Sequence, residues 1–518
     1  MLIGIDVSRT AETKTGLGSY AHSLVAAMAR VDKTNEYLLY PFVWDCFPPN
    51  YEAAFCPQQA NFKIARRRVP KRVIQRLWEK ASAADKGEIM GGEPDVYFSP
   101  FHSVPQRNYQ RLVCVYHDIS FRVHPEFSTQ ENIDHCEVSF ARAVSNADHM
   151  VTVSHFSKKE MVEKMGVPAD WISVTHEAAD PMFQRIHGCQ LPGRIRKDIG
   201  EPDQTILYVG SVEPRKNLAT LIRAYDALVS RGKSKPVLII AGGSGWKNSD
   251  VYEEIDRRGL KDSVYFTGFV TDQELVQLYN ASTIFVFPTI YEGFGLPVIE
   301  AMSCGTPVVT SRVSSIPEVG GDAVSYIDDP FDDENLCKHM EEILSSPERQ
   351  EDLAARGLTR AGTFTWERTA SETLAILEQV HQDPQYRRQR IEMGVDERGL
   401  ARGWHPQEID GSSVFRWAER EATVRLFAPK DSNRRLVIEA AGSIPGDEQV
   451  LAVRVNGLQI GCPSLSTEWQ TFHFPLPDRI PRDQEIEIAL RVNFELPPAM
   501  KGDDPRSLGF RATKVCFE

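Results

Sequence analysis

The chain has 518 residues, of which 42% are hydrophobic and 25% charged, a composition that excludes a disordered or fibrous protein. Its net charge of −13 argues against a nucleic-acid binder, because such binding requires Lys and Arg to neutralise phosphates. Nine scattered cysteines without a C-x-x-C pair indicate free thiols rather than a disulfide framework or a zinc site.

The N-terminal segment Met1–Asp6 lacks the basic and apolar regions of a signal peptide. No stretch approaches the roughly 18 apolar residues that a membrane span needs. We therefore expect a cytoplasmic protein, bound at most to the surface of a membrane.

Two successive runs of short apolar segments alternate with helical patterns. The first predicts a helix over Gly18–Arg30 and strands at Leu2–Val7, Tyr37–Tyr40, Val96–Phe98, Leu112–Tyr116 and Met150–Val153. The second predicts a helix over Leu218–Ser230 and strands at Ile206–Val209, Val237–Ala241, Val264–Thr267, Ile284–Phe287, Val308–Thr310 and Ala323–Ile327. This alternation is typical of parallel sheets with helices on both faces. The two runs join near Asp180–Pro202, which predicts two doubly wound α/β domains that face each other.

After about residue 395 the chain changes to apolar and polar residues that alternate with a period of two. Such segments are Val414–Trp417, Thr423–Phe427, Arg435–Ala440, Val450–Val455, Trp469–Phe474 and Glu485–Val492. Short alternating strands separated by turn residues favour an all-β sandwich or jelly roll. We predict domains at 1–190, 191–395 and 396–518.

A glycine-rich loop after the strand Ile284–Phe287 carries the strongest chemical signal. It leads into a helix that begins near Leu296, and the N-terminus of a helix suits a diphosphate because its backbone N–H groups and dipole attract anions. The predicted donor-binding residues of this loop are Gly293, Phe294, Gly295 and Leu296. Glu292 and Glu300 lie eight positions apart, so one can bind sugar hydroxyls and the other a ribose diol. A helix-capping glutamate and a solvated glutamate are the alternative.

Candidate ligand-binding residues follow three other predicted elements. Arg215 and Lys216 come after the strand Ile206–Val209, where they can neutralise a leaving-group phosphate. His117 ends a strand of the first domain, at the edge of a parallel sheet where ligands bind. Gly16, Gly18 and Ser19 form a glycine-rich turn before the first helix, but no acidic residue closes the second strand as a dinucleotide-binding enzyme requires.

Together these motifs resemble those of retaining glycosyltransferases of family 4. The resemblance covers about residues 1–390 and rests on Glu292 with Glu300, on the run Glu213–Asn217, on His117 and on the Gly16–Tyr20 segment. It is nearest to bacterial mannosyltransferases that build O-antigen, the lipopolysaccharide side chain, or capsule. The tail Asp504–Phe510 resembles part of the small β-sandwich modules of bacterial polysaccharide enzymes.

The resemblance implies the GT-B fold of two facing Rossmann-like domains and a function in surface polysaccharide synthesis. The donor would be a nucleotide sugar, GDP-mannose in our prediction, and the acceptor a glycan or lipid-linked glycan. Arg215, Lys216 and the Gly16–Ser19 segment would hold the diphosphate. Glu300 would take the ribose, Glu292 the hydroxyls of the donor sugar, and His117 would touch that sugar from the acceptor side. Many relatives have an arginine where this chain has Ser211.

We predict that no cofactor and no metal ion take part. Enzymes of the GT-A class hold a divalent ion with an Asp-x-Asp motif, and this motif does not occur in the 518 residues. Cationic side chains and a helix dipole would therefore stabilise the leaving diphosphate.

Each of two further features allows two interpretations. The basic segment Lys63–Arg76 could contact anionic lipids at the inner face of the plasma membrane, or it could be a solvated helix face. Trp404, Trp417 and Trp469 could stack on sugar rings, although we favour positions in a β-sandwich core.

A non-catalytic carbohydrate-binding or assembly protein is the main alternative function, and intact Glu292, Glu300, Arg215 and Lys216 argue against it.

Overall fold

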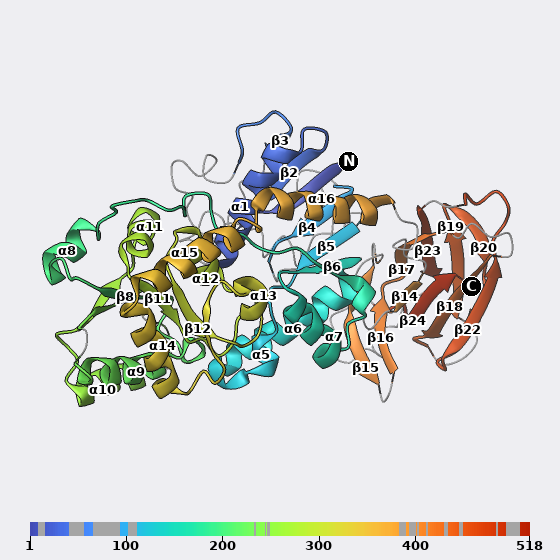
Figure 1. Ribbon diagram of the computed structural model, residues 1–518. Coiled ribbons are helices and arrows are strands. Elements are labelled where there is room, and N and C mark those ends of the chain that lie inside the picture. The colour runs from blue at the N-terminus through green and yellow to red at the C-terminus, as the bar shows by residue number, and fades with distance from the viewer. Residues whose placement is uncertain are drawn as a thin grey trace.

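The computed structural model contains two parallel α/β sheets followed by two antiparallel sheets (Figure 1). The described residues are 1–8, 16–40, 56–65, 94–101, 111–232, 235–243, 245, 249–382, 390–392, 400, 403–410, 413–428, 434–444, 449–482, 485–493 and 508–517. The predicted fold class, two doubly wound α/β units and an all-β unit, is confirmed.

The first sheet has seven parallel strands in the order β3-β2-β1-β4-β5-β6-β7. They are β1 (Leu2–Asp6), β2 (Glu36–Tyr40), β3 (Phe62–Ile64), β4 (Val96–Ser99), β5 (Arg111–Val115), β6 (His149–Thr152) and β7 (Ile172–Val174). The associated helices are α1 (Gly16–Val31), α5 (Ser120–Val123), η1 (Pro125–Phe127), α6 (Gln130–Asn146), α7 (His155–Met165) and η2 (Ala169–Trp171). The strand order reverses between β1 and β4.

The second sheet has six parallel strands in the order β10-β9-β8-β11-β12-β13. They are β8 (Thr205–Val209), β9 (Val237–Ala241), β10 (Val264–Gly268), β11 (Ile284–Phe287), β12 (Val308–Ser311) and β13 (Ser325–Ile327). The helices are α8 (Gly193–Ile199), η3 (Pro214–Lys216), α9 (Leu218–Ser230), α10 (Ser249–Arg258), α11 (Asp272–Ala281), α12 (Leu296–Ser303), α13 (Ile316–Gly320), α14 (Asp333–Leu344), α15 (Pro347–Ala361) and α16 (Trp366–Gln382). Here the order reverses between β8 and β11, and ligands of such sheets bind beyond the carboxyl ends of the strands at this point.

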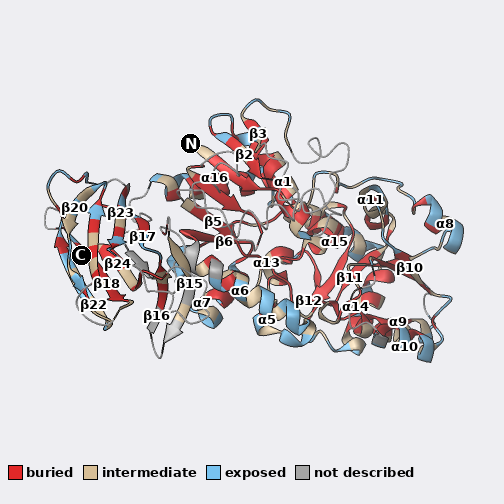
Figure 2. Ribbon diagram, turned by 180° about the vertical axis from the view of Figure 1, so that it is seen from behind, coloured by how far each residue is buried: buried red, intermediate tan, exposed pale blue. Residues whose placement is uncertain are grey.

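The apolar runs of the sequence become the buried strands of these sheets. All four residues of β11 are fully buried, and the strands are among the most buried parts of the molecule in Figure 2. Polar residues cap some of the helices: Thr271 and Glu274 form a reciprocal capping box at the start of α11. One hydrophobic cluster extends through both α/β units.

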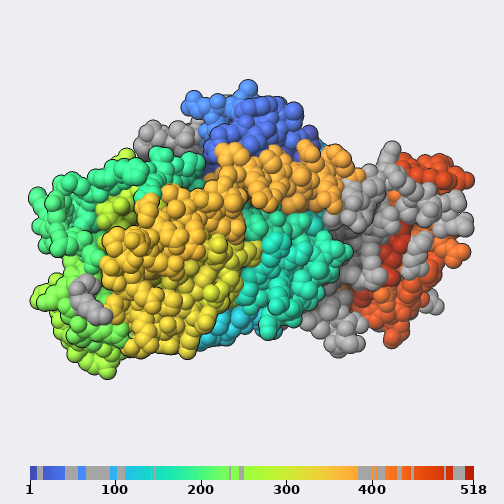
Figure 3. All heavy atoms as spheres, viewed as in Figure 1, coloured from blue at the N-terminus to red at the C-terminus, as the bar shows by residue number. Residues whose placement is uncertain are grey.

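By its contacts the helix α16 belongs to the first α/β unit, although it follows the second unit in the chain. It packs against α1 of the first unit, and it crosses the upper part of the molecule below the blue N-terminal segments in Figures 1 and 3. Trp366 at its start is buried, and its ring meets that of Tyr20 at a centroid distance of 5.7 Å. Residues assigned by sequence to the second domain therefore complete the first.

The C-terminal region consists of two antiparallel sheets that share a core separate from that of the α/β units. One sheet contains β14 (Arg390–Glu392), β15 (Trp404–Asp410), β16 (Ser413–Ala418), β18 (Arg435–Gly442), β22 (Gln470–Pro475) and β24 (Phe510–Phe517). The other contains β17 (Glu421–Phe427), β19 (Gln449–Val455), β20 (Leu458–Gly461), β21 (Ser464–Leu465) and β23 (Glu485–Val492).

Two expectations about this region need correction. The boundary predicted at 395/396 is too late, because β14 precedes it and pairs with the last strand, β24. Of the three tryptophans, Trp404 packs against Phe510 beside the core. Trp417 and Trp469 instead lie half-buried next to the Arg511 guanidinium, with ring centroids 5.9 and 5.0 Å from its central carbon.

The described helices include none that is long and apolar enough to span a membrane. In the basic segment predicted to contact lipid, Lys63 lies in β3 and forms an ion pair with Glu36 at 3.0 Å. The remaining cations of that segment, Arg66–Arg76, lie outside the described residues.

Candidate active site

A cleft with a volume of about 890 Å³ lies between the two α/β units. Its walls include residues that follow β5 in the first sheet and residues that follow β8 and β11 in the second. Because β8 and β11 are the strands between which the sheet order reverses, the cleft occupies the position at which doubly wound sheets bind ligands.

The loop between β11 and α12 forms one wall of the cleft. Gly295 precedes α12 with φ of 111° and lies against Ile316, so a side chain there would be strained and would also clash. Gly293 lies against the first unit: an added Cβ would be 2.8 Å from the carbonyl oxygen of His117. No side chain caps α12, and its first residues, Leu296 and Pro297, line the cleft.

Three residues predicted from two separate motifs come together at this wall. The Nζ of Lys216 lies 2.7 Å from Oε1 of Glu292, and Nη1 of Arg215 lies 3.0 Å from its Oε2. Arg215 also pairs with Glu213 at 2.9 Å, while Lys216 lies over the ring of Phe287 at 4.8 Å. The two carboxylates balance the two cations, so the cluster is held in place by charges buried in the protein.

Burial and charge act in opposite directions on this cluster. Burial alone would raise the pKa of Glu292, but the attraction of Arg215 and Lys216 prevails and lowers the pKa to about 2. Burial also lowers the pKa of Lys216, against the pull of Glu292. The pKa of Arg215 is raised despite burial, because Glu292 and Glu213 favour its charged form.

Hydroxyl groups fix the backbone around Glu292. Thr289 donates to its Oε1 at 2.9 Å, and Ser315 donates to the carbonyl oxygens of Glu292 and Phe294 at 2.9 and 2.8 Å. Ser314 accepts from the N–H of Glu292 at 2.9 Å while its own φ is 48°, a strained value for serine. The sequence analysis did not predict a role for Ser314 and Ser315, because these serines reach Glu292 only when α13 packs beside the loop.

His117 lies on the opposite wall, two residues beyond β5. It is buried, with Nδ1 3.1 Å from Oε1 of Glu177 and Nε2 3.2 Å from the carbonyl oxygen of Pro100. The ring of Tyr20 meets it edge-on at 4.7 Å. Sequence reasoning also missed Glu177, although its position shortly after β7 at the same sheet edge offered a signal.

Glu300 lines the cleft from α12, one helical turn beyond Leu296. Tyr279 of α11 donates to its Oε2 at 2.9 Å. Burial raises the pKa of Glu300 to about 8, and the negative charge of Asp180 adds to the effect. At neutral pH this carboxyl group is therefore mostly protonated. The carboxyl group of Glu292, on the loop that precedes α12, is ionised.

The remaining predicted residues are Gly16, Gly18 and Ser19 of the first unit and Phe294 of the second. Gly16 and Ser19 line it, whereas Gly18 is buried and is not among the lining residues. The prediction of a turn at Gly16–Ser19 is wrong: α1 begins at Gly16, so these residues form its first turn. Phe294 is buried in the core and also touches the cleft.

The chain is similar in sequence to several known proteins. The profile of the family described as glycosyl transferases group 1 matches residues 194–360. The O-antigen chain mannosyltransferase B of Escherichia coli is 34% identical over 279 residues, which cover 54% of this chain and 73% of that protein. The serotype-specific mannosyltransferase WbdA of Escherichia coli is 30% identical over 275 residues, 52% of this chain but only 33% of WbdA.

Among solved structures, HepE of Anabaena in complex with UDP and glucose aligns with a TM-score of 0.55 and 18% identity, over 73% of this chain and 99% of HepE. At this identity the likeness shows the fold.

Proposed function

Because this chain belongs to the group 1 glycosyltransferases, family 4 with the GT-B fold, we propose that it transfers a mannosyl group from GDP-mannose to a glycan or lipid-linked glycan, with retention of configuration. The product would be a bacterial surface polysaccharide. The activity of a glycosyltransferase follows from the family; the sugar, the acceptor and the pathway are the proposal.

The cluster of Glu292, Arg215 and Lys216 is the observation that carries this proposal. The half-buried Arg215 and the buried Lys216 line the same cleft as the first turn of α12, so a diphosphate in the cleft can meet both side-chain charge and a helix N-terminus. The diphosphate must compete with Glu292 for those cations. A Glu292 carboxylate displaced from them would be free to accept hydrogen bonds from the hydroxyls of the donor sugar.

The transfer step breaks the bond between the anomeric carbon and the diphosphate oxygen. The acceptor hydroxyl oxygen forms the new bond on the face that the leaving group vacates, and its proton passes to the departing phosphate. Arg215 and Lys216 stabilise the charge that develops on that phosphate, which is the main source of rate enhancement in this proposal. His117, oriented by Glu177, would contact the sugar from the acceptor side and Glu300 the ribose.

The names of the relatives support a mannosyl donor, since both Escherichia coli proteins are mannosyltransferases. The test is calorimetric titration with GDP-mannose, dTDP-rhamnose, UDP-glucose and UDP-N-acetylglucosamine. We expect GDP-mannose to bind most tightly and to be hydrolysed or transferred. Tighter binding of another donor would change the sugar assignment. Binding of none, with retained binding of glycans, would favour a carbohydrate-binding or assembly protein.

Metal independence is tested separately, by measuring turnover in excess EDTA. We expect Mg²⁺ and Mn²⁺ to restore no turnover after EDTA treatment, because protein cations occupy the place of an ion at the diphosphate. Loss of turnover that Mg²⁺ or Mn²⁺ restores would contradict this phosphate model.

A further inference from the structure

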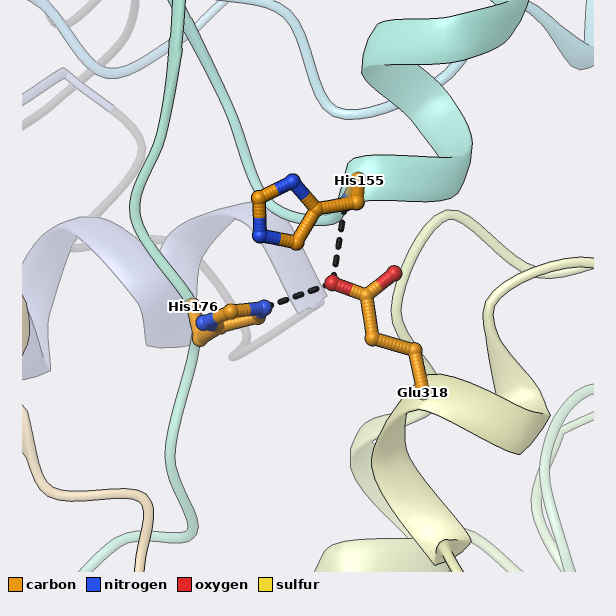
Figure 4. A group of neighbouring side chains, drawn as sticks. All are labelled: His155, His176 and Glu318. Carbon is orange, nitrogen blue, oxygen red and sulfur yellow. Dashed lines mark hydrogen bonds and ion pairs between the residues drawn. The ribbon is translucent and has the colours of Figure 1, made fainter.

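A second cluster of ionisable side chains lies where the two α/β units meet, outside the donor cleft (Figure 4). His155 is the first residue of α7 and His176 follows β7, both in the first unit. Glu318 belongs to α13 of the second unit. We propose that these three residues bind a divalent transition metal ion, Zn²⁺ in particular, that ties the two units together.

The distances fit a three-ligand site after a small adjustment. One ligand atom from each residue lies within 4.8 Å of the other two, and Nε2 of His176 is already 2.6 Å from Oε1 of Glu318. Ligand atoms around tetrahedral zinc are about 3.3 Å apart, since each lies about 2.0–2.1 Å from the ion. The exposed ring of His155 can close the remaining gap by rotating its side chain, and Figure 4 shows both rings on the same side of the Glu318 carboxylate.

The donor set is the one that zinc uses. Two imidazoles and one carboxylate hold Zn²⁺ in sites that keep a fourth position for water, and the exposure of His155 leaves a path for the ion and the water. Binding would exchange the hydrogen bond between His176 and Glu318 for two metal bonds, with the remaining proton of the ring on Nδ1.

Neighbouring groups already orient two of the three ligands. The backbone N–H groups of His155 and Phe156 donate to the two carboxylate oxygens of Glu318, at 2.8 and 3.2 Å. The ring of His176 packs edge-on against Phe364 with centroids 5.6 Å apart. Such outer contacts fix ring and carboxylate orientations and strengthen metal binding.

The position of the cluster gives the ion a role beyond local stability. Ser154, next to His155, donates to the carbonyl oxygen of Gly293 at 2.7 Å, and Glu177, next to His176, holds His117. An ion at the cluster would therefore hold together the segments that form both walls of the cleft. It would not touch the donor diphosphate, so this inference is independent of the proposed transfer chemistry.

The test uses the full chain after treatment with EDTA and desalting. Titration with ZnCl₂ in a calorimeter should show one ion per chain, and thermal unfolding should shift upward at saturating Zn²⁺. We expect His155→Ala and Glu318→Gln each to weaken binding by about 100-fold or more and to abolish the thermal shift. His135→Ala, which removes an exposed histidine on α6, is the matched control and should bind as the wild type does.

Titration with Co²⁺ gives a second readout. The visible spectrum of the wild type should show the intense bands of a four-coordinate ion, and His155→Ala should lose them. Wild-type affinity in both His155→Ala and Glu318→Gln, or only the weak spectrum of aqueous Co²⁺, would overturn the proposal. GDP-mannose binding, measured on the same variants, keeps a failure of this metal site distinct from a failure of the proposed function.

Discussion

Lys216 is the residue at which the proposed chemistry depends most on one charge. Lys216→Ala should lower turnover by about 10²–10³, the scale for the loss of one preorganised donor to a developing charge. Glu292 keeps Arg215 as a partner, so we expect the variant to fold. Steady-state kinetics and circular dichroism are the measurements.

The control for this variant is Lys261→Ala, which removes a lysine from an exposed ion pair with Asp256. Exposed pairs contribute little, so its turnover should equal that of the wild type. A near wild-type rate in Lys216→Ala would remove this lysine from the mechanism.

Glu300 makes stability depend on pH in a direction opposite to that of most carboxylates. Its pKa rises from 4.5 to about 8 on folding, so the folded state binds more protons between these values. The stability due to the protonated group is complete below pH 4.5 and is lost as the pH rises through 8. The Tm of Glu300→Gln relative to wild type should therefore increase from pH 5 to pH 8.5.

Glu342→Gln, at an exposed glutamate on α14 whose side chain does not line the cleft, serves as the comparison and should show no such trend. If the difference in Tm between Glu300→Gln and wild type is constant over this range, the carboxyl group is not protonated in the folded protein.

How far individual residues could be predicted depends on what surrounds them in the chain. Arg215, Lys216 and Glu292 each follow a strand of a parallel sheet, so the rule that ligands bind at the carboxyl ends of strands was enough to select them. Glu177 was missed although it follows β7 at the sheet edge where ligands bind, and Ser314 was missed because nothing local distinguishes it. Their contacts are with residues 60 and 22 positions away, the side chain of His117 and the backbone N–H of Glu292.

At the scale of elements, the loop before α12 belongs to the second unit and lies in close contact with the first. Gly293→Ala would place a Cβ 2.8 Å from the carbonyl oxygen of His117 and 3.0 Å from Cβ of Asp118. Because that oxygen is backbone, the units must separate slightly. We expect a Kd for the donor at least about tenfold weaker, with circular dichroism unchanged, because 1.4 kcal/mol of lost contact suffices for a factor of ten.

Gly193→Ala provides the control for this substitution. A Cβ at Gly193, in the first turn of α8, meets no atom within 4 Å, so the donor should bind with wild-type affinity. Unchanged donor binding in Gly293→Ala would show that the close approach of the two units at this loop is not needed.

Elements were predicted well where their pattern is regular and missed where it is interrupted. The strand Ile284–Phe287 and the helix Leu218–Ser230 have the predicted limits. The edge strand β15 contains Pro406 and lacks alternation. In β24, Thr513 and Lys514 break the period of two, because a bulge shifts the register against β18 between Glu439 and Ala440.

At the scale of the whole molecule, the α/β units extend to the end of α16 and the β-sandwich includes β14. A chain that ends at Gln382 keeps α16 against α1 and loses only the region with a separate core. We expect it to be folded and to bind the donor nucleotide within about twofold of the full chain. Calorimetry with GDP is the measurement.

A chain that ends at Phe364 is the informative comparison, since it also loses Trp366, which lines the cleft and packs on Tyr20. We expect that chain to bind nucleotide poorly. Should the Gln382 truncation be folded and yet fail to bind, the β-sandwich contributes to the donor site.

The crossing of α16 also sets an order of events during protein synthesis. The apolar face of α1 leaves the ribosome early, whereas its partner helix begins 335 residues after α1 ends. At about 5–20 residues per second, this interval lasts on the order of 17–67 s. During that time the nascent first unit exposes a hydrophobic strip to chaperones and to other nascent chains. Deletion of α16 should therefore lengthen chaperone association of the nascent chain, whereas removal of the β-sandwich should not.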